Sequence, residues 1–299
     1  MNSLKNQGRG GFDHAAGHLK SSVLYRAHTS NDSLEVIDCH QDKYLRSIPN
    51  LMGVAGVLVS NERDIVFTSN RGENTVGVFN HWKERRLHKI KVGGRPNGLA
   101  FDASRNTLLA ANVPKPNSQD LVTMSIVDVG TRMTIVDVTI PGRTRWAVFD
   151  PESERFYVNI ADPSEIAILD AKDPDGLVGS YRIPAAGPHG LDLDRRGRRL
   201  LCACDEGRLY EVYLESGKVS EPSKLAGAPD AIFYNPDLDH LYVTIGDPSV
   251  LQVFDAKSMK EIQTVTTEIR THTIAFNQDL GKVYAFSPET HRASIYQEA

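Results

Sequence analysis

The chain has 299 residues, a formal net charge of −4 and 40% hydrophobic residues, which is enough to build a core and excludes a disordered tail or a membrane protein. Its basic residues are scattered, so we expect neither a nucleic-acid nor a membrane partner. The odd cysteine count, from Cys39, Cys202 and Cys204, does not suit a disulfide framework, and no apolar leader follows Met1. We therefore predict a cytoplasmic protein.

A repeat runs through the chain. Seven segments share one pattern of a polar residue, a small residue, three strand-type residues and a turn: FDHAAG, VAGVLVS, PNGLAFD, RWAVFDP, PHGLDLD, PDAIFYNP and HTIAFNQ. We anchor them at Ala15, Gly56, Gly98, Trp146, Gly190, Ala231 and Thr273. The gaps of 41, 42, 48, 44, 41 and 42 residues match one four-stranded propeller blade each.

Three further β-rich runs follow each anchor. The second and third runs, such as DIVFTSN and TVGVFN in the second repeat, alternate and are rich in β-branched and aromatic residues. The fourth run is more polar, as an outermost strand should be. The sequence therefore predicts an all-β, seven-bladed propeller over residues 1–299 as one domain. The last repeat stops after its third strand, so its outer strand is either missing or supplied by residues before Phe12.

The glycine anchors mark a position where we expect the backbone to approach its neighbours closely: Gly56, Gly98 and Gly190. The residues immediately before the seven anchors are, in blade order, His14, Ala55, Asn97, Arg145, His189, Asp230 and His272. With 10 histidines in the chain, seven random positions would hold about 0.2, so three histidines are an enrichment. Blades 5, 6, 7 and 1 are neighbours in a closed ring, which makes His189, Asp230, His272 and His14 one arc.

Three imidazoles and a carboxylate are donors that a divalent ion such as Zn²⁺, Fe²⁺, Mn²⁺ or Cu²⁺ accepts. We therefore predict a metal site formed by His14, His189, Asp230 and His272. Arg145, on the other arc, is predicted to clamp a carboxylate or oxyanion, and Asn97 to donate a hydrogen bond to the substrate. The alternative is that the histidines act as general acid and base without a metal.

A second column, at the ends of the second strands, contains His28 in the same blade as His14. His28 is a candidate to extend the ligand set or support it, and the competing interpretation is a solvated histidine at a strand end.

Two segments resemble the YVTN-type repeats of the YncE-like propeller superfamily: LYVTIGDPSVLQVFDAKSMKEIQTV and VFTSNRGENTVGVFN. The resemblance covers essentially the whole chain and implies that the first strand of every blade lines a central channel. Locally, GPHGLDLD at His189 is similar to the P-H-G segments of virginiamycin B lyase-like propellers, although the glutamates expected to hold a metal there are not recognisable. Gluconolactonase-type propellers use Glu, Asn and Asp ligands, which the three-histidine arc does not match.

These observations predict a metal-dependent enzyme that acts on a small, oxygen-rich or anionic substrate at the channel mouth, as a lactone or ester hydrolase or an eliminating lyase. Two alternatives stay open. One is a non-catalytic scaffold or ligand-binding propeller, and the other is a metal-dependent oxidoreductase, because the ligands suit both Zn²⁺ and Fe²⁺.

Overall fold

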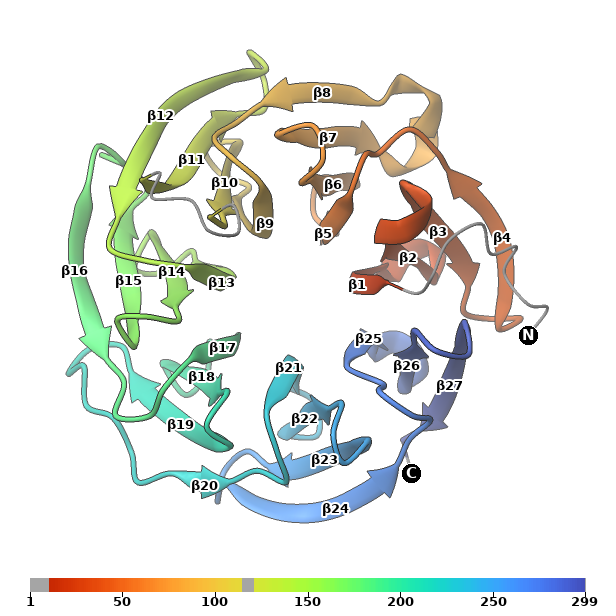
Figure 1. Cartoon of the computed structure of the whole chain (residues 1–299), viewed down its shortest axis with the longest axis vertical. Coiled ribbons are helices and arrows are strands. Elements are labelled where there is room, and N and C mark those ends of the chain that lie inside the picture. Colours follow the sequence, from red (N-terminus) through yellow and green to blue (C-terminus); the bar gives the residue numbers. More distant parts are fainter. Residues whose placement is uncertain (1–10, 115–120, 299) are drawn as a thin grey trace.

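Seven antiparallel sheets are arranged radially around a central axis in the computed structural model, which describes residues 11–114 and 121–298 (Figure 1). Six of the described sheets have four strands and the seventh has three. Within each sheet the strands follow one another from the axis outward in chain order. The prediction of an all-β, seven-bladed propeller is confirmed.

The first three blades have these bounds: β1 (Phe12–His18), β2 (Val23–His28), β3 (Ser33–Asp38) and β4 (Lys43–Ile48); β5 (Val54–Ser60), β6 (Ile65–Asn70), β7 (Thr75–Asn80) and β8 (His88–Lys91); β9 (Pro96–Asp102), β10 (Thr107–Asn112), β11 (Val122–Asp128) and β12 (Met133–Ile140). Blades 4 and 5 follow: β13 (Thr144–Asp150), β14 (Arg155–Ile160), β15 (Glu165–Asp170) and β16 (Leu177–Arg182); β17 (Pro188–Asp194), β18 (Arg199–Cys204), β19 (Arg208–Tyr213) and β20 (Ser223–Lys224).

The last two blades are β21 (Pro229–Asn235), β22 (His240–Ile245), β23 (Val250–Asp255) and β24 (Lys260–Thr266); β25 (Thr273–Asn277), β26 (Lys282–Ser287) and β27 (Arg292–Gln297). Short 3-10 helices occupy four connections: η1 (Leu19–Ser21), η2 (Thr29–Asn31), η3 (His81–Arg86) and η4 (Gln278–Leu280). None of the helices in the described part of the chain is long and apolar enough to cross a membrane.

Every blade turns from its first to its second strand through a residue with positive φ. This residue directly precedes the second strand, and it is Ser22, Asp64, Asn106, Glu154, Arg198, Asp239 or Gly281. Asn, Asp and Gly adopt this left-handed conformation at low cost, so most of these turns are encoded locally.

The hydrophobic core lies between the blades. Each of seven buried clusters in the described residues draws its side chains from two neighbouring blades, as Met124 of blade 3 and Phe156 of blade 4 illustrate. Because every blade packs on two neighbours, the ring of interfaces holds the fold together.

The glycine anchors permit this close packing. A Cβ atom on Gly56 would lie 2.0 Å from the carbonyl oxygen of Asn97 in the next blade, and one on Gly98 would lie 2.3 Å from that of Arg145. The same column in blade 5 holds Gly190, where a Cβ would lie 2.8 Å from Asp230 O. The prediction of close backbone approach at these glycines is confirmed.

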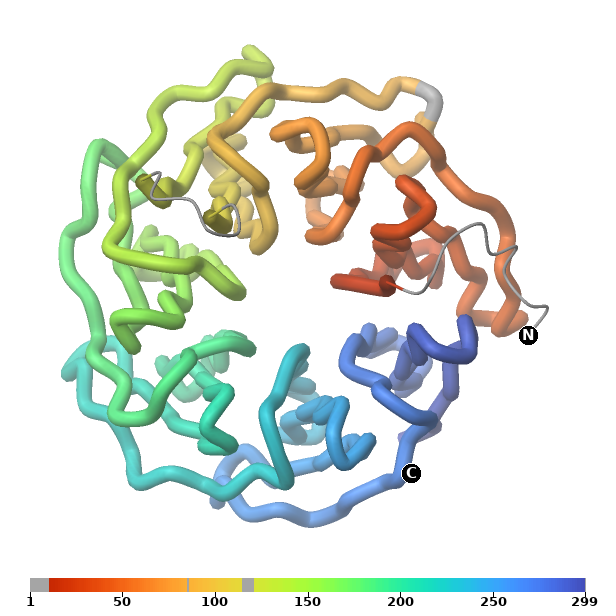
Figure 2. The backbone as a smooth tube through the Cα atoms, in the orientation of Figure 1, coloured from red at the N-terminus to blue at the C-terminus, as the bar shows by residue number. Residues whose placement is uncertain are grey.

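Blade 7 closes the ring against blade 1, and Figure 2 shows the two blades side by side. Tyr284 Oη donates a hydrogen bond to Asp42 Oδ1 at 2.5 Å, and Lys282 Nζ lies 2.9 Å from Asp42 Oδ2. Among the described residues blade 7 has three strands. The alternative in which residues before Phe12 supply its outer strand concerns residues 1–10, which lie outside the described residues.

Strand pairing corrects the alignment of blade 1 by one residue. Phe12 pairs with His28 at the end of the second strand, as Pro188 pairs with Cys204 in blade 5. Asp13 is therefore the counterpart of His189, and His14 is the counterpart of the anchor Gly190. The placement of His14 in the same column as the other two histidines was wrong, because blade 1 has Phe12 and His14 where blades 3 and 5 have the proline and glycine that mark the register.

Candidate functional site

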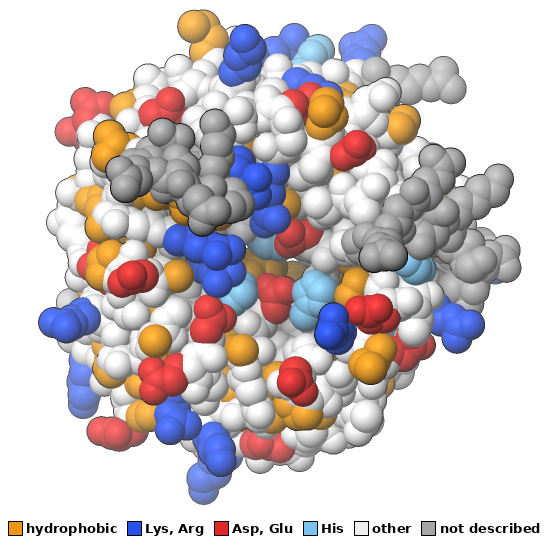
Figure 3. Space-filling model, in the orientation of Figure 1, with side chains coloured by type: hydrophobic (Ala, Val, Ile, Leu, Met, Phe, Trp, Pro, Cys, Tyr) orange, Lys and Arg blue, Asp and Glu red, His pale blue; other side chains and the backbone are white. Residues whose placement is uncertain are grey.

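Charged side chains and histidines gather around one mouth of the channel, which we call the first mouth (Figure 3). The corrected column at this mouth is Asp13, Ala55, Asn97, Arg145, His189, Asp230 and His272. All but His272 are the second residue of an inner strand, and His272 directly precedes β25. Their common position at the start of inner strands brings residues from all seven blades to one place.

His189 lies between two carboxylates. Its Nδ1 is 2.7 Å from Asp205 Oδ1, and its Nε2 is 3.2 Å from Asp230 Oδ1. Although burial disfavours the charged imidazole, the hydrogen bonds to Asp205 and Asp230 raise the pKa of His189. Burial would also raise the pKa of Asp230, but the hydrogen bond to His189 and the nearby His272 hold it well below its usual value. His189 is therefore a largely but not fully buried imidazole that readily accepts a proton.

The raised pKa of His189 predicts a pH-dependent contribution to stability. The protonated form is stabilised by folding, so this contribution is complete below the unfolded pKa of about 6.5 and disappears as pH rises through the higher folded pKa. We expect His189→Gln to lower the free energy of unfolding by about 1–2 kcal/mol near pH 6 and by less near pH 9. Urea unfolding of both proteins across this range measures the difference; an equal loss at both pH values would contradict the assignment.

His272 points its ring at backbone oxygens. Its Nδ1 is 2.9 Å from Arg270 O and its Nε2 is 3.2 Å from Phe12 O, whereas Nε2 is 3.9 Å from Asp230 Oδ2. His272 therefore joins the mouth of blade 7 to blade 1 and approaches Asp230 without a hydrogen bond.

His14 and Trp146 meet across the channel. They project from blades 1 and 4, and their rings stack with centroids 4.1 Å apart and planes 9° apart. Trp146 also contacts Phe233 of blade 6 edge to face, with centroids 6.4 Å apart. Burial lowers the pKa of His14, although Asp13 and Asp230 partly offset this effect. The stacked pair forms a partition between the first mouth and the rest of the channel.

The predicted ligands do not fit a divalent metal ion. His14 is stacked on Trp146, both nitrogens of His189 face carboxylates, and both nitrogens of His272 face backbone carbonyls. Within residues 11–114 and 121–298, no group of three or more His, Cys, Asp and Glu side chains is arranged to hold a metal ion. The metal site at His14, His189, Asp230 and His272 stays a prediction without geometric support, and we derive no chemistry from it.

Arginines gather on the opposite arc of the mouth. Arg145 Nη1 lies 3.3 Å from His189 Nε2, and Nη2 lies 3.2 Å from Asp205 Oδ2. Arg71 Nη2 pairs with Asp13 Oδ2 at 3.2 Å and donates to Asn97 Oδ1. Partial burial, and then the positive charges of Arg145, Arg71 and Arg95, lower the pKa of Arg143. Like charges therefore crowd at this arc, and Asp13 and Asp205 pair with two of the four arginines.

Two other predicted residues have different roles from those expected. Asn97 lies at the mouth, but its side-chain oxygen accepts from Arg71, so it positions that guanidinium. His28 is fully buried away from the arc, where its Nδ1 lies 3.0 Å from Glu35 Oε1 and its ring contacts Phe12. The structure does not bring His28 to the candidate site.

Sequence reasoning missed the residues that the loops contribute to the site. Arg71 and Asp205 directly follow the second strands of blades 2 and 5, while Arg95 and Arg143 directly precede the inner strands of blades 3 and 4. Arg71 and Asp205 lie one residue beyond the column at the ends of the second strands, and Arg95 and Arg143 lie two residues before the column of Asn97 and Arg145. The repeat alignment, extended by these residues, would have revealed the arginine cluster.

Comparisons with known proteins support the fold more than any function. No family model matches the chain. The chain is 23% identical over 201 residues to the uncharacterized protein YncE of Salmonella typhi, an alignment of 64% of this chain and about half (53%) of that protein. A chain of Kuenenia stuttgartiensis hydrazine synthase has the same fold, with a TM-score of 0.83 and 13% identity over 99% of this chain and 97% of that chain.

Proposed function

We propose that this protein, a distant homologue of YncE in the YVTN/YncE-like propeller family, binds a small oxygen-rich anion at its first mouth. We propose further that His189 exchanges a proton with the bound molecule. The observation that carries the proposal is the crowding of Arg71, Arg95, Arg143 and Arg145, the last of which contacts His189.

The arginines offer hydrogen-bond donors as well as charge. Among the described residues, the Nε atoms of Arg71, Arg95 and Arg145 are buried and lack a protein partner. A buried donor without an acceptor is costly, and a carboxylate or phosphate oxygen would satisfy it while neutralising the repulsion between the guanidiniums. A bound anion would stabilise above all Arg95 and Arg143, which form no ion pair among the described residues.

His189 is placed to act on the anion. When Nδ1–H donates to Asp205, the Nε2 atom carries a lone pair and faces Arg145, so it can accept a proton from a group held by that guanidinium. Asp230 then stabilises the imidazolium that forms, because its Oδ1 lies 3.2 Å from Nε2. Two reactions suit this arrangement. His189 could remove a proton from a carbon next to a carboxylate, or from a water molecule that attacks a lactone or ester. An eliminating lyase or a lactone or ester hydrolase is thus the reaction class we propose.

Titration with malonate and inorganic phosphate tests the binding step. We expect calorimetry to show binding that weakens with added salt, and Arg95→Gln/Arg143→Gln to raise the dissociation constant about tenfold or more. Arg292→Gln, which removes an exposed arginine on β27, is the matched control and should leave the affinity unchanged. Equal affinities for the double variant and the control would refute the proposal.

Measuring the metal content of the same untagged preparations distinguishes this proposal from the predicted metal site. We expect well below one divalent ion per chain, and anion binding that survives a chelator. A stoichiometric ion that is lost in His189→Ala and His272→Ala would overturn the metal-free reading and restore the four-ligand prediction.

A further inference from the structure

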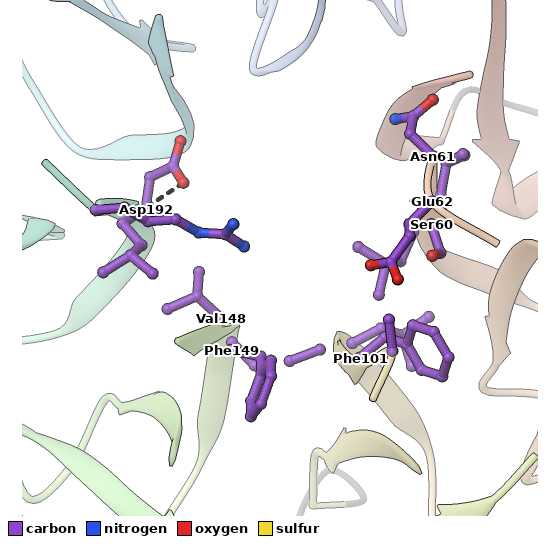
Figure 4. A pocket seen from close by; sticks show the side chains of 15 residues that line it. Ser60, Asn61, Glu62, Phe101, Val148, Phe149 and Asp192 are labelled. Atoms are coloured by element: carbon purple, nitrogen blue, oxygen red, sulfur yellow. Dashed lines mark hydrogen bonds between the residues drawn. The ribbon is translucent and has the colours of Figure 1, made fainter. Parts of the chain in front are cut away.

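Beyond the His14–Trp146 pair the channel continues as a cavity at the second mouth, which we call the lower cavity. Figure 4 shows the part of it between blades 2 to 5. One part has a volume of about 480 Å³ and extends from His14 and Trp146 to Arg195. An overlapping part of about 470 Å³ extends along the inner strands of blades 2 to 5. Both volumes fall within the range of small-molecule sites, which is about 300–1,000 Å³.

One carboxylate interrupts an apolar belt in this cavity. Strand pairing places seven residues at equivalent positions, each opposite the third residue of a second strand: Ala16, Leu58, Ala100, Val148, Asp192, Phe233 and Ala275. Six are apolar and Asp192 is charged. All seven except Ala275 line one of the two parts of the cavity. A charged group within a row of apolar side chains is typical of a ligand site, in which the polar group fixes the orientation of an apolar molecule.

Asp192 is held in place by backbone amides. Its Oδ2 accepts from Tyr234 N at 2.7 Å and its Oδ1 from Leu193 N at 2.8 Å. Burial raises the pKa of the carboxyl to about 6, and the positive charge of Arg195 offsets part of this effect. The side chain is thus fixed and ionised above neutral pH.

The charges around the cavity favour a cation. Glu62 and Asp192 lie on opposite sides of the cavity, with Phe101, Val148 and Phe149 between them (Figure 4). Arg195 also lines it. The side chains of Glu62 and Arg195 are both exposed, so water screens their charges more than that of the partly buried Asp192. Asp192 is therefore the least screened charge of the lining, and it is negative.

We infer that the lower cavity is a second binding site, which takes a small amphipathic amine. The ammonium group pairs with Asp192, and the apolar body lies against Val148 and the phenylalanines of blades 3 and 4. The site uses none of the residues of the first mouth and stands independently of the anion-binding proposal.

Tryptophan fluorescence offers a direct test, because Trp146 borders the lower cavity. Trp82→Phe leaves Trp146 as the one remaining tryptophan of the two in the chain. At a pH of about 8, we expect 2-phenylethylamine to change the Trp146 emission saturably, and the neutral 2-phenylethanol and anionic 3-phenylpropanoate to bind about tenfold more weakly or not at all.

Two variants test whether the ammonium group pairs with Asp192. In the Trp82→Phe protein, Asp192→Asn should weaken 2-phenylethylamine binding about tenfold while keeping an acceptor for Tyr234 N. Asp173→Asn, at an exposed aspartate of the β15–β16 turn, is the control and should bind like the parent. A thermal melt confirms that each variant is folded. Tighter binding of 3-phenylpropanoate than of the amine, or equal amine binding by both variants, would overturn the inference.

Discussion

Replacing Gly56 by alanine should lower the free energy of unfolding by about 3 kcal/mol. The new Cβ would lie 2.0 Å from Asn97 O and 2.6 Å from Ser69 Oγ. Ser69 Oγ itself donates to Asn97 O at 2.8 Å, so the bond that joins blades 2 and 3 would have to move.

Gly94→Ala is the matched control for this substitution. Nothing lies within 4 Å of a Cβ built on Gly94, and the residue is exposed. Urea unfolding should therefore place this variant within about 0.5 kcal/mol of the parent. Similar losses in the two variants would mean that blades 2 and 3 do not approach each other as closely as the structure shows.

Replacing Arg145 should have the largest effect on anion binding, because Arg145 contacts both His189 and Asp205. We expect Arg145→Gln to raise the dissociation constant for malonate more than tenfold, and Arg145→Lys to raise it about tenfold, since lysine keeps the charge but loses the planar pair of donors. Calorimetry on folded variants measures both values.

The pH dependence of activity in the same variants gives a second measurement. The positive charge of Arg145 opposes protonation of His189, so its loss in Arg145→Gln should raise the pKa of His189 and, if the proposed reaction is found, shift its pH-rate profile to higher pH. Arg145→Lys should leave the profile nearer that of the parent. Full affinity and an unshifted profile in Arg145→Gln would remove Arg145 from the proposed site.

The fold was predictable from the sequence because a propeller repeats its local rules. The polar turn, the small anchor and the alternating strands recur at nearly constant spacing, so an uncertain blade is supported by the others. Blade 1 shows the limit of this reasoning: its anchor is the histidine His14 instead of a small residue, and the register was decided only by the pairing of Phe12 with His28.

The candidate site was predictable in part. The column that contains Arg145, His189, Asp230 and His272 follows from the repeat, since equivalent positions of inner strands end at one mouth. Which of these side chains touch one another does not follow, because it depends on contacts between blades. Asp205 reaches His189 from a loop of the same blade, whereas Asp230 reaches it from the next.

Only the closed ring decided the remaining features. His14 and Trp146 come from blades 1 and 4, which share no interface, and they meet because closure places those blades across the channel from each other. His28 lies in the same blade as His14, yet the buried Glu35 holds it inside that blade. Periodicity in a sequence reports which strand a residue belongs to and which face it occupies. The curvature that turns seven blades into a ring determines which faces meet, and no single repeat encodes it.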